Sequence, residues 1–259
     1  MEKQGTTGKA IDTYMPDHRL ECVLSPKWVR VYFGGETVAD SRRVMLLRET
    51  GRLPVYYFPQ EDVRMDLLCD ESVDGEVRRW SIQARERRAA NAAWSRTDPK
   101  AAAAGLAGHI AFEWSAMDAW FEEDEEVYVH PRDPYKRIDV AHSSRHVHVV
   151  VAGETVAETR RPVLLFETNY PTRYYIPKMD LRLDALVPSE TQTQCPYKGL
   201  ASYYSVRVGD TLIKDIAWYY PFPLAEVGKI QNRVCFFNER VDALYVDGEL
   251  LPKPKTQWS

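Results

Sequence analysis

The sequence predicts a mostly β protein made of two tandem homologous domains with few short helices. The first observation behind this prediction is an internal repeat: residues 35–68 and 153–186 align without a gap at a constant offset of 118, with 18 of 34 positions identical. The second is the pattern of apolar residues, which alternate with polar ones or form short runs between turn residues, as in strands. Self-similarity at a fixed offset indicates that the two halves share one fold.

The repeat also sets the expected domain limits. A chain of 259 residues could form one or two domains by length alone, and the repeat favours two of ordinary size. We predict an N-terminal arm at residues 1–24, a first β domain at 25–126, a linker at 127–142 and a second β domain at 143–259. Each domain is long enough to bury a core of its own.

Composition and charge exclude several classes of protein. Hydrophobic residues make up 44% of the chain and charged residues 28%, which is typical of a soluble globular protein. No apolar run approaches the roughly 20 residues of a membrane helix, and the N-terminus lacks an apolar signal region. We therefore expect a cytoplasmic location and no membrane partner. The net charge of −4 and the pI near 5.9 argue against general binding of nucleic acid.

The cysteines give no sign of a disulfide framework or a metal site. Cys22, Cys69, Cys195 and Cys235 are far apart, and none belongs to a CxxC pair. Neither a zinc knuckle nor a cofactor-binding motif is present in the sequence, so we expect no metal and no cofactor. The sequence does not predict the oligomeric state.

The first copy illustrates the predicted strands. Residues 28–41, WVRVYFGGETVADS, indicate a strand, a tight turn and a second strand. Residues 44–47 form a short apolar run, and residues 54–59 form an aromatic strand bounded by prolines. Residues 62–67 alternate charged and apolar side chains, which also predicts a strand with one charged face.

One segment of the first copy has helical composition but is predicted to be a strand. Residues 85–94, RERRAANAAW, are rich in alanine and arginine, which favour helix. The corresponding segment of the second copy, residues 205–218, is typical of a β-hairpin around Gly209 and Asp210. Because copies of one domain should share a fold, we expect tertiary context to override helix propensity here. Short helices are expected only at residues 99–106 and 223–227, each opened by a proline.

Several motifs of the second copy resemble a known family. They are GETVA, LLFET, YYIP, DLRLDAL, TQCPYKGLASYYSV, DIAWYYPFP and VDALYVDGE. The sequence resembles the tandem form of a bacterial and fungal domain of unknown function that is in places labelled a nucleotidyltransferase. The resemblance is close over residues 143–249 and looser over 25–126. It implies a β-tent-like fold of coiled antiparallel sheets and implies little about activity. The first copy lacks CPYKG and has WSRT in place of WYYP, so we expect it to be a degenerate copy.

The two copies differ most at residues 193–199, TQCPYKG, where the second copy carries six additional residues. A segment kept by one copy and absent from the other is a candidate for chemistry rather than for folding. A lysine three residues from a cysteine across a turn favours the thiolate. Cys195 is therefore a candidate nucleophile or redox-sensitive group, and Lys198 a candidate activating or anion-binding cation. Alternatively, Cys195 is a small core residue and Lys198 a solvated turn residue.

Glu167 and its counterpart Glu49 follow an apolar run in both copies. A carboxylate at the end of a buried strand needs a donor, and Arg160 or Arg161 is the expected partner. Because the position is acidic in both copies, a structural ion pair is one interpretation. A general acid or base role for Glu167 is the other.

Aromatic residues are concentrated in the second domain. We predict that Tyr175, Tyr204, Trp218 and Tyr220 line a small-ligand pocket there, with Arg161 as a further ligand contact. Alternation along the strands would equally bury some of these rings in the core.

Three functions are consistent with these residues. The favoured interpretation is that the second domain binds a small metabolite. The cation at Lys198 would suit an anionic one. The alternatives are an enzyme that uses Cys195, either a transferase or a redox catalyst, and a protein-interaction module with an aromatic docking face.

A nucleotidyltransferase activity is disfavoured. That chemistry needs two metal-binding carboxylates beside a glycine turn that holds phosphate. Asp180 and Asp184 are four residues apart rather than two, and the sequence contains no glycine-rich phosphate loop.

Overall fold

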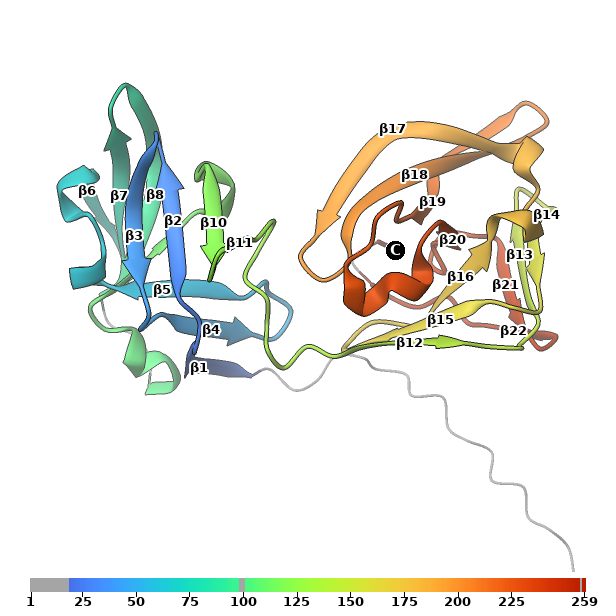
Figure 1. Ribbon diagram of the computed structural model, residues 1–259, viewed down its shortest axis with the longest axis horizontal. Coiled ribbons are helices and arrows are strands. Elements are labelled where there is room, and N and C mark those ends of the chain that lie inside the picture. Colours follow the sequence, from blue (N-terminus) through green and yellow to red (C-terminus); the bar gives the residue numbers. More distant parts are fainter. Residues whose placement is uncertain (1–18, 98–100, 257) are drawn as a thin grey trace, which may run out of the picture.

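The computed structural model describes residues 19–97, 101–256 and 258–259. Within these residues the chain forms two lobes that correspond to the two halves of the repeat (Figure 1). Each lobe pairs a seven-stranded sheet with a four-stranded sheet, and neighbouring strands run antiparallel. The prediction of two tandem, mostly β domains of antiparallel sheets is confirmed.

The strands of the first domain follow one order in each sheet. Its seven-stranded sheet contains, from edge to edge, β1 (Leu20–Leu24), β4 (Met45–Glu49), β5 (Val55–Pro59), β9 (His109–Phe112), β8 (Arg87–Arg96), β7 (Val77–Ala84) and β6 (Leu68–Asp74). Its four-stranded sheet contains β11 (Glu125–Glu126), β10 (Ala119–Glu122), β2 (Val29–Phe33) and β3 (Glu36–Ser41). Strand β8 covers the alanine-rich segment 85–94 almost completely, which confirms the prediction taken from the second copy.

The second domain repeats this topology strand for strand. Its seven-stranded sheet contains β12 (Ile138–His142), β15 (Val163–Glu167), β16 (Arg173–Pro177), β20 (Arg233–Phe236), β19 (Thr211–Tyr219), β18 (Gly199–Val208) and β17 (Leu186–Cys195). Its four-stranded sheet contains β22 (Glu249–Leu250), β21 (Ala243–Val246), β13 (Val147–Val151) and β14 (Glu154–Thr159). The hairpin β17–β18 is longer than its counterpart β6–β7, and it arches over the lobe in Figure 1.

The helices are short turns of 3-10 type. They are η1 (Gln60–Asp62), η2 (Met65–Leu67), η3 (Ala101–Leu106), η4 (Trp114–Ala116), η5 (Lys178–Asp180), η6 (Leu183–Ala185) and η7 (Ala225–Ile230). The predicted strand at residues 62–67 is wrong, because η1 and η2 occupy most of this segment and only Val63 forms an isolated bridge. The expected helices near 99–106 and 223–227 correspond to η3 and η7, although Pro99 lies outside the described residues.

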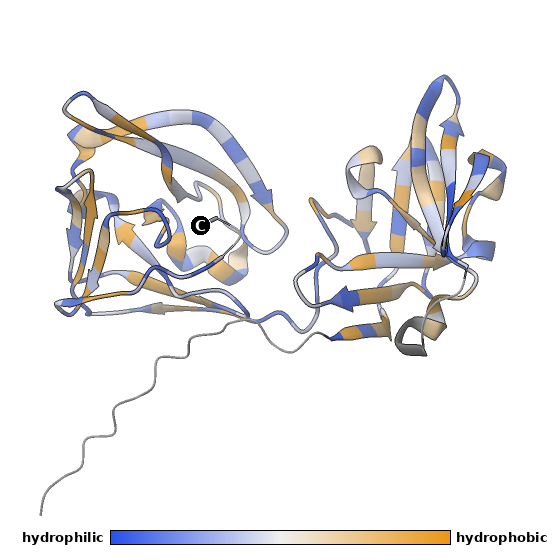
Figure 2. Ribbon diagram, turned by 180° about the vertical axis from the view of Figure 1, so that it is seen from behind, coloured by the Kyte–Doolittle hydropathy of each residue, from blue (hydrophilic) through white to orange (hydrophobic). Residues whose placement is uncertain are grey.

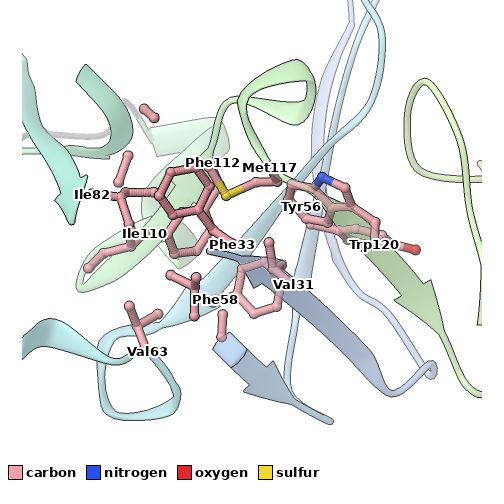
Figure 3. Packing of buried hydrophobic residues seen from close by; sticks show 14 of the residues in the cluster. Val31, Phe33, Tyr56, Phe58, Val63, Ile82, Ile110, Phe112, Met117 and Trp120 are labelled. Atoms are coloured by element: carbon pink, nitrogen blue, oxygen red, sulfur yellow. The ribbon is translucent and has the colours of Figure 1, made fainter. Parts of the chain in front are cut away.

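The main core of each domain lies between its two sheets. In the first domain, Val31 and Phe33 of β2 meet Phe58 of β5, Ile82 of β7 and Phe112 of β9 (Figure 3). Alternate residues of β2 are fully buried, as expected for a strand with one face on the core. Burial of each such large side chain contributes roughly 1.5–3 kcal/mol, so this layer supplies much of the stability of the domain.

A second apolar cluster lies on the opposite face of each seven-stranded sheet. In the second domain it contains Leu165, Tyr175, Trp218 and Cys235, covered by Val227 of η7. Both faces of these central strands are therefore apolar, and hydrophobic residues follow one another along them, whereas the arching β17 is largely hydrophilic (Figure 2). This second face positions the candidate site.

Two edge strands lie outside the predicted domain limits. Leu20–Leu24 falls in the predicted arm, yet as β1 it pairs with β4. Ile138–His142 falls in the predicted linker, yet as β12 it pairs with β15. Each domain therefore begins earlier than predicted, because these edge strands precede the repeated segment. Residues 1–18 of the predicted arm lie outside the described residues.

In the described part of the chain, no helix has both the length and the apolar composition needed to cross a membrane.

Candidate functional site

Glu167, the last residue of β15, is the central charge of the candidate site. Its carboxylate accepts a hydrogen bond from Lys198 Nζ at 2.5 Å and lies 2.8 Å from Lys136 Nζ. Lys198 belongs to the turn between β17 and β18, and Lys136 precedes β12, so three separate segments meet here. The three side chains are only 9%, 12% and 19% exposed for Glu167, Lys198 and Lys136. Two ammonium groups around one carboxylate leave an excess of positive charge.

The pKa values of this group follow from its pairing. Burial by itself would raise the pKa of Glu167, but the charges of Lys198 and Lys136 outweigh it and hold this pKa below its ordinary value. Burial would lower the pKa of Lys198, whereas the Glu167 carboxylate raises it above the ordinary value. The contact is therefore a salt bridge at neutral pH. The predicted partners, Arg160 and Arg161, do not supply it.

The CPYKG segment builds the turn that brings Lys198 to Glu167. The Lys198 N–H donates to the Cys195 carbonyl at 3.3 Å, and the Lys198 carbonyl accepts from Leu224 N at 3.2 Å. Gly199 has a φ of +95°, and a Cβ there would lie 3.2 Å from the Phe222 carbonyl oxygen. Glycine is needed at this position for both reasons. The turn is thus fastened to the chain that leads into η7.

Tyr197 of the same turn contacts the segment between the domains. Its hydroxyl accepts a hydrogen bond from the Asp133 N–H at 2.6 Å, and its ring centroid lies 5.8 Å from that of His130. Asp133 also lies 3.3 Å from Arg48 of the first domain. Burial lowers the pKa of His130, so its imidazole is neutral at neutral pH. The inserted turn therefore takes part in fixing the interdomain segment beside the site.

Three of the predicted aromatic residues form the floor of the site. Trp218 Nε1 donates to Tyr175 Oη at 3.2 Å, and Tyr220 belongs to the same buried cluster. Their exposed fractions are 8%, 1% and 4% for Trp218, Tyr175 and Tyr220, so they are core residues rather than an open lining. Burial raises the pKa of the Cys235 thiol in this cluster to about 12, which keeps it protonated.

The accessible aromatic surface comes from other residues. The ring of Tyr170 lies 4.4 Å from Lys136 Nζ, and Trp258 near the C-terminus packs on Tyr170 with centroids 5.5 Å apart. The C-terminus lies within the ring of strands of the second lobe in Figure 1. Trp258 also contacts Phe237, so the C-terminal segment covers part of the apolar floor.

A buried ion pair lies beside this floor and was not predicted from the sequence. Arg173 Nη1 and Nη2 donate to the two carboxylate oxygens of Glu239 at 2.8 and 2.7 Å, and Thr256 Oγ1 donates to the same carboxylate at 2.7 Å. The repeat carried a signal for this pair. The copies align at an offset of 118 before the six additional residues and of 124 after them. Arg173 and Glu239 therefore correspond to Val55 and Ser115, so both charges are present in one copy only.

The structure does not bring Tyr204 and Arg161 to the site. Tyr204 lies next to Tyr203 on β18, and alternation turns it to the opposite face, where it stacks on Tyr219 at 4.9 Å. Arg161 donates to both carboxylate oxygens of Asp180, at 3.0 and 2.7 Å, and lines a separate surface depression of about 430 Å³. Tyr204 therefore lies on another face, and Arg161 at another position, than the predicted residues around Glu167.

The structure brings Cys195, Lys198 and Glu167 close together. Cys195 is half-buried at the end of β17, and its proximity contributes to the raised pKa of Lys198. The Lys198 ammonium is nevertheless held by Glu167, so the lysine serves the carboxylate rather than the thiol. Among the described residues, no group of three or more His, Cys, Asp or Glu side chains could hold a metal ion.

The comparisons with known proteins concern the whole chain. None of the curated proteins compared with it shows significant similarity. The family described as a domain of unknown function, DUF427, matches residues 21–123 and again residues 139–247. The two matches correspond to the two lobes and together cover most of the chain. The protein therefore belongs to the DUF427 family and carries its domain twice.

Proposed function

We propose that the second domain binds a small anionic metabolite at the site around Glu167. The observation that carries this proposal is the pairing of one largely buried carboxylate with two ammonium groups, those of Lys198 and Lys136. The excess charge is available to one carboxylate or phosphate group of a ligand. Charge-assisted hydrogen bonds of this kind are about twice as strong as neutral ones, and more so where water is partly excluded.

The aromatic residues around the charges suit a ligand with a flat apolar part. Tyr170 lies against Lys136 and next to Trp258, and both rings are partly accessible. Phe237 contacts both Trp258 and Trp218, and Trp218 is hydrogen-bonded to Tyr175, so the partly accessible rings continue into the buried floor. A few charged groups over an apolar surface are typical of small-ligand sites. No contact among the described residues favours the cysteine enzyme or the interaction module instead.

The proposal is tested by identifying small molecules that copurify with the protein. Wild type, Lys136→Gln and Lys198→Gln are purified at low ionic strength, denatured, and their extracts compared by mass spectrometry. Arg161→Gln is the matched control, because it removes a second-domain cation that lies away from the site. We expect an anionic compound with wild type and Arg161→Gln that is reduced at least about tenfold in the two lysine variants.

Circular dichroism establishes that each variant is folded before its extract is compared. Equal amounts of every anionic compound in the folded lysine variants and in the control would refute the proposal.

A further inference from the structure

The first domain contains a cavity of about 310 Å³ on the second apolar face of its seven-stranded sheet. Its apolar wall includes Tyr57 of β5 and Trp94 of β8, and Trp94 Nε1 donates to Tyr57 Oη at 3.2 Å. The equivalent rings of the second domain, Trp218 and Tyr175, form the floor of its site and have the same hydrogen-bond distance. The volume is near the lower end of the range of small-molecule sites, which is roughly 300–1,000 Å³.

The cavity is rich in positive charge. Arg52, Arg79 and Arg96 all line it, together with the single carboxylate of Glu49. Arg52 lies 3.4 Å from that carboxylate and so neutralises it. Within the described ranges, 19–97, 101–256 and 258–259, no carboxylate is paired with Arg79 or Arg96. Among the described residues, these two guanidinium groups are therefore cations without a carboxylate partner.

One of these cations has an unsatisfied donor. The Nε atom of Arg96 is buried, and no described residue accepts its hydrogen bond. Leaving a buried polar group without a partner costs roughly 1–3 kcal/mol, so such groups in folded proteins commonly have a partner. A bound anion would satisfy this donor. Guanidinium groups present paired N–H donors that match carboxylate and phosphate oxygens.

The comparison of the two copies explains why this space is open. In the second domain the carboxylate equivalent to Glu49, that of Glu167, is closed by Lys198 from the inserted turn. The first domain lacks that insertion, and its shorter hairpin turns at Gly75, leaving Arg79 of β7 at the cavity wall. The first domain therefore lacks the CPYKG segment but has an open cavity, so the difference between the copies is more than the loss of the second-domain site.

We propose that the first domain has a ligand site of its own, which takes a small molecule with a carboxylate or phosphate group on a flat apolar body. Arg79 and Arg96 bind the anionic group, and Tyr57 and Trp94 pack against the apolar body. The first copy is then a second binding domain of different specificity and not a degenerate repeat.

Fluorine NMR of the full chain labelled with 5-fluorotryptophan tests this site directly. The chain has seven tryptophans, and the Trp94 resonance is assigned from the Trp94→Phe variant. The probes are phenyl phosphate, benzoate and the uncharged benzyl alcohol. We expect the Trp94 resonance to shift saturably with at least one of the two anions, and to shift much less with benzyl alcohol.

Three arginine variants locate the binding. Arg79→Gln and Arg96→Gln should each weaken binding of that anion by roughly tenfold or more, because each removes charge-assisted hydrogen bonds. Arg78→Gln is the matched control, since Arg78 is the neighbour of Arg79 on β7 and instead lies 3.3 Å from Glu71. Arg78→Gln should leave the affinity within about twofold of wild type, because a surface ion pair contributes little energy.

The site would be overturned if neither anion shifted the Trp94 resonance, if benzyl alcohol acted as strongly as the anions, or if Arg78→Gln weakened binding as much as Arg79→Gln. The Trp218 resonance reports the second domain independently. A shift of Trp218 alone would overturn the first-domain site and leave the function proposed for the second domain intact.

Discussion

Trp218 Nε1 donates a hydrogen bond to Tyr175 Oη at 3.2 Å, in the middle of the second apolar face of its sheet. The first domain repeats this contact between Trp94 and Tyr57 at the same distance. The copies therefore share one aromatic floor and differ in what surrounds it. In the second domain the floor is bordered by paired charges and by the C-terminal segment, and in the first by an open, arginine-rich cavity.

Replacing Lys198 by methionine should destabilise the protein by about 2 kcal/mol. Removing one partner of a buried salt bridge costs roughly 3–5 kcal/mol when the other charge is left uncompensated, and Lys136 here reduces that cost. Urea unfolding followed by circular dichroism measures the change. The double variant Lys198→Met with Glu167→Gln should recover part of the loss, because no carboxylate is then left short of a partner.

Lys178→Met provides the control for this substitution, since Lys178 is a lysine of the same domain that lies over aromatic rings and has no carboxylate partner among the described residues. If the Lys198 and Lys178 variants lost the same stability, the salt bridge with Glu167 would not be the cause.

Stability should depend on pH through Glu167. Its pKa is lowered in the folded protein, so its contribution is fully present above the ordinary value of 4.5 and is lost as the pH falls through the folded pKa. The free energies of unfolding of wild type and Glu167→Gln should therefore differ by a constant amount above pH 5 or so and converge below about pH 4.5. Urea unfolding of both proteins at several pH values gives this difference, and a gap that widened on acidification would contradict the assignment.

The buried pair of Arg173 and Glu239 should show strong coupling. Arg173→Val introduces the residue of the first copy and leaves the Glu239 carboxylate, whose side chain is 0% exposed, without its bidentate partner. We expect a loss of about 3–5 kcal/mol. Adding Glu239→Ser, again the residue of the first copy, should restore more than half of it, as measured by thermal and urea unfolding. Additive losses in the double variant would show that the two residues stabilise the fold independently.

Much of the fold could be predicted because the repeat supplied two views of one structure. Propensity alone makes residues 85–94 a helix, and only the hairpin pattern of the second copy indicated the strand β8 that the structure contains. The period-two pattern at residues 62–67 wrongly predicted a strand. Charged and apolar residues alternate there, but the backbone turns through η1 and η2 and only Val63 reaches a neighbouring strand.

The site could be predicted only in part, for two physical reasons. The inserted turn identified Lys198 and Cys195, because a length difference between copies is visible in the sequence. The partners of Glu167 were missed, since Lys136 reaches the site only through the course of the segment between the domains. Tyr203 and Tyr204 are neighbours in sequence but face opposite sides of β18, and aromatic content alone does not say which face is the core.

The four cysteines should differ widely in reactivity. Cys235 is 0% exposed and burial raises its pKa to about 12, so iodoacetamide should not modify it in the native protein. Cys195 is half-buried beside a turn and should react first in the second domain. Peptide mass spectrometry after timed labelling resolves the two sites, with labelling in urea as the control for intrinsic reactivity. Modification of Cys235 as fast as Cys195 under native conditions would mean that the aromatic floor opens readily.

Gly199→Ala should be the most disruptive alanine substitution among the turn glycines of the second domain. Its φ of +95° disfavours any residue with a side chain, and the added Cβ would lie 3.2 Å from the Phe222 carbonyl oxygen, a backbone atom that cannot rotate away. We expect a loss of about 2–3 kcal/mol, combining backbone strain of roughly 1–2 kcal/mol with the crowding. Gly248→Ala is the matched control, because its φ is +87° with nothing within 4 Å of the added atom, and it should lose only the strain. The comparison by urea unfolding separates the two effects. Equal losses for the two variants would show that the turn tolerates the Cβ, and that close contact with the segment before η7 does not hold Lys198 in place.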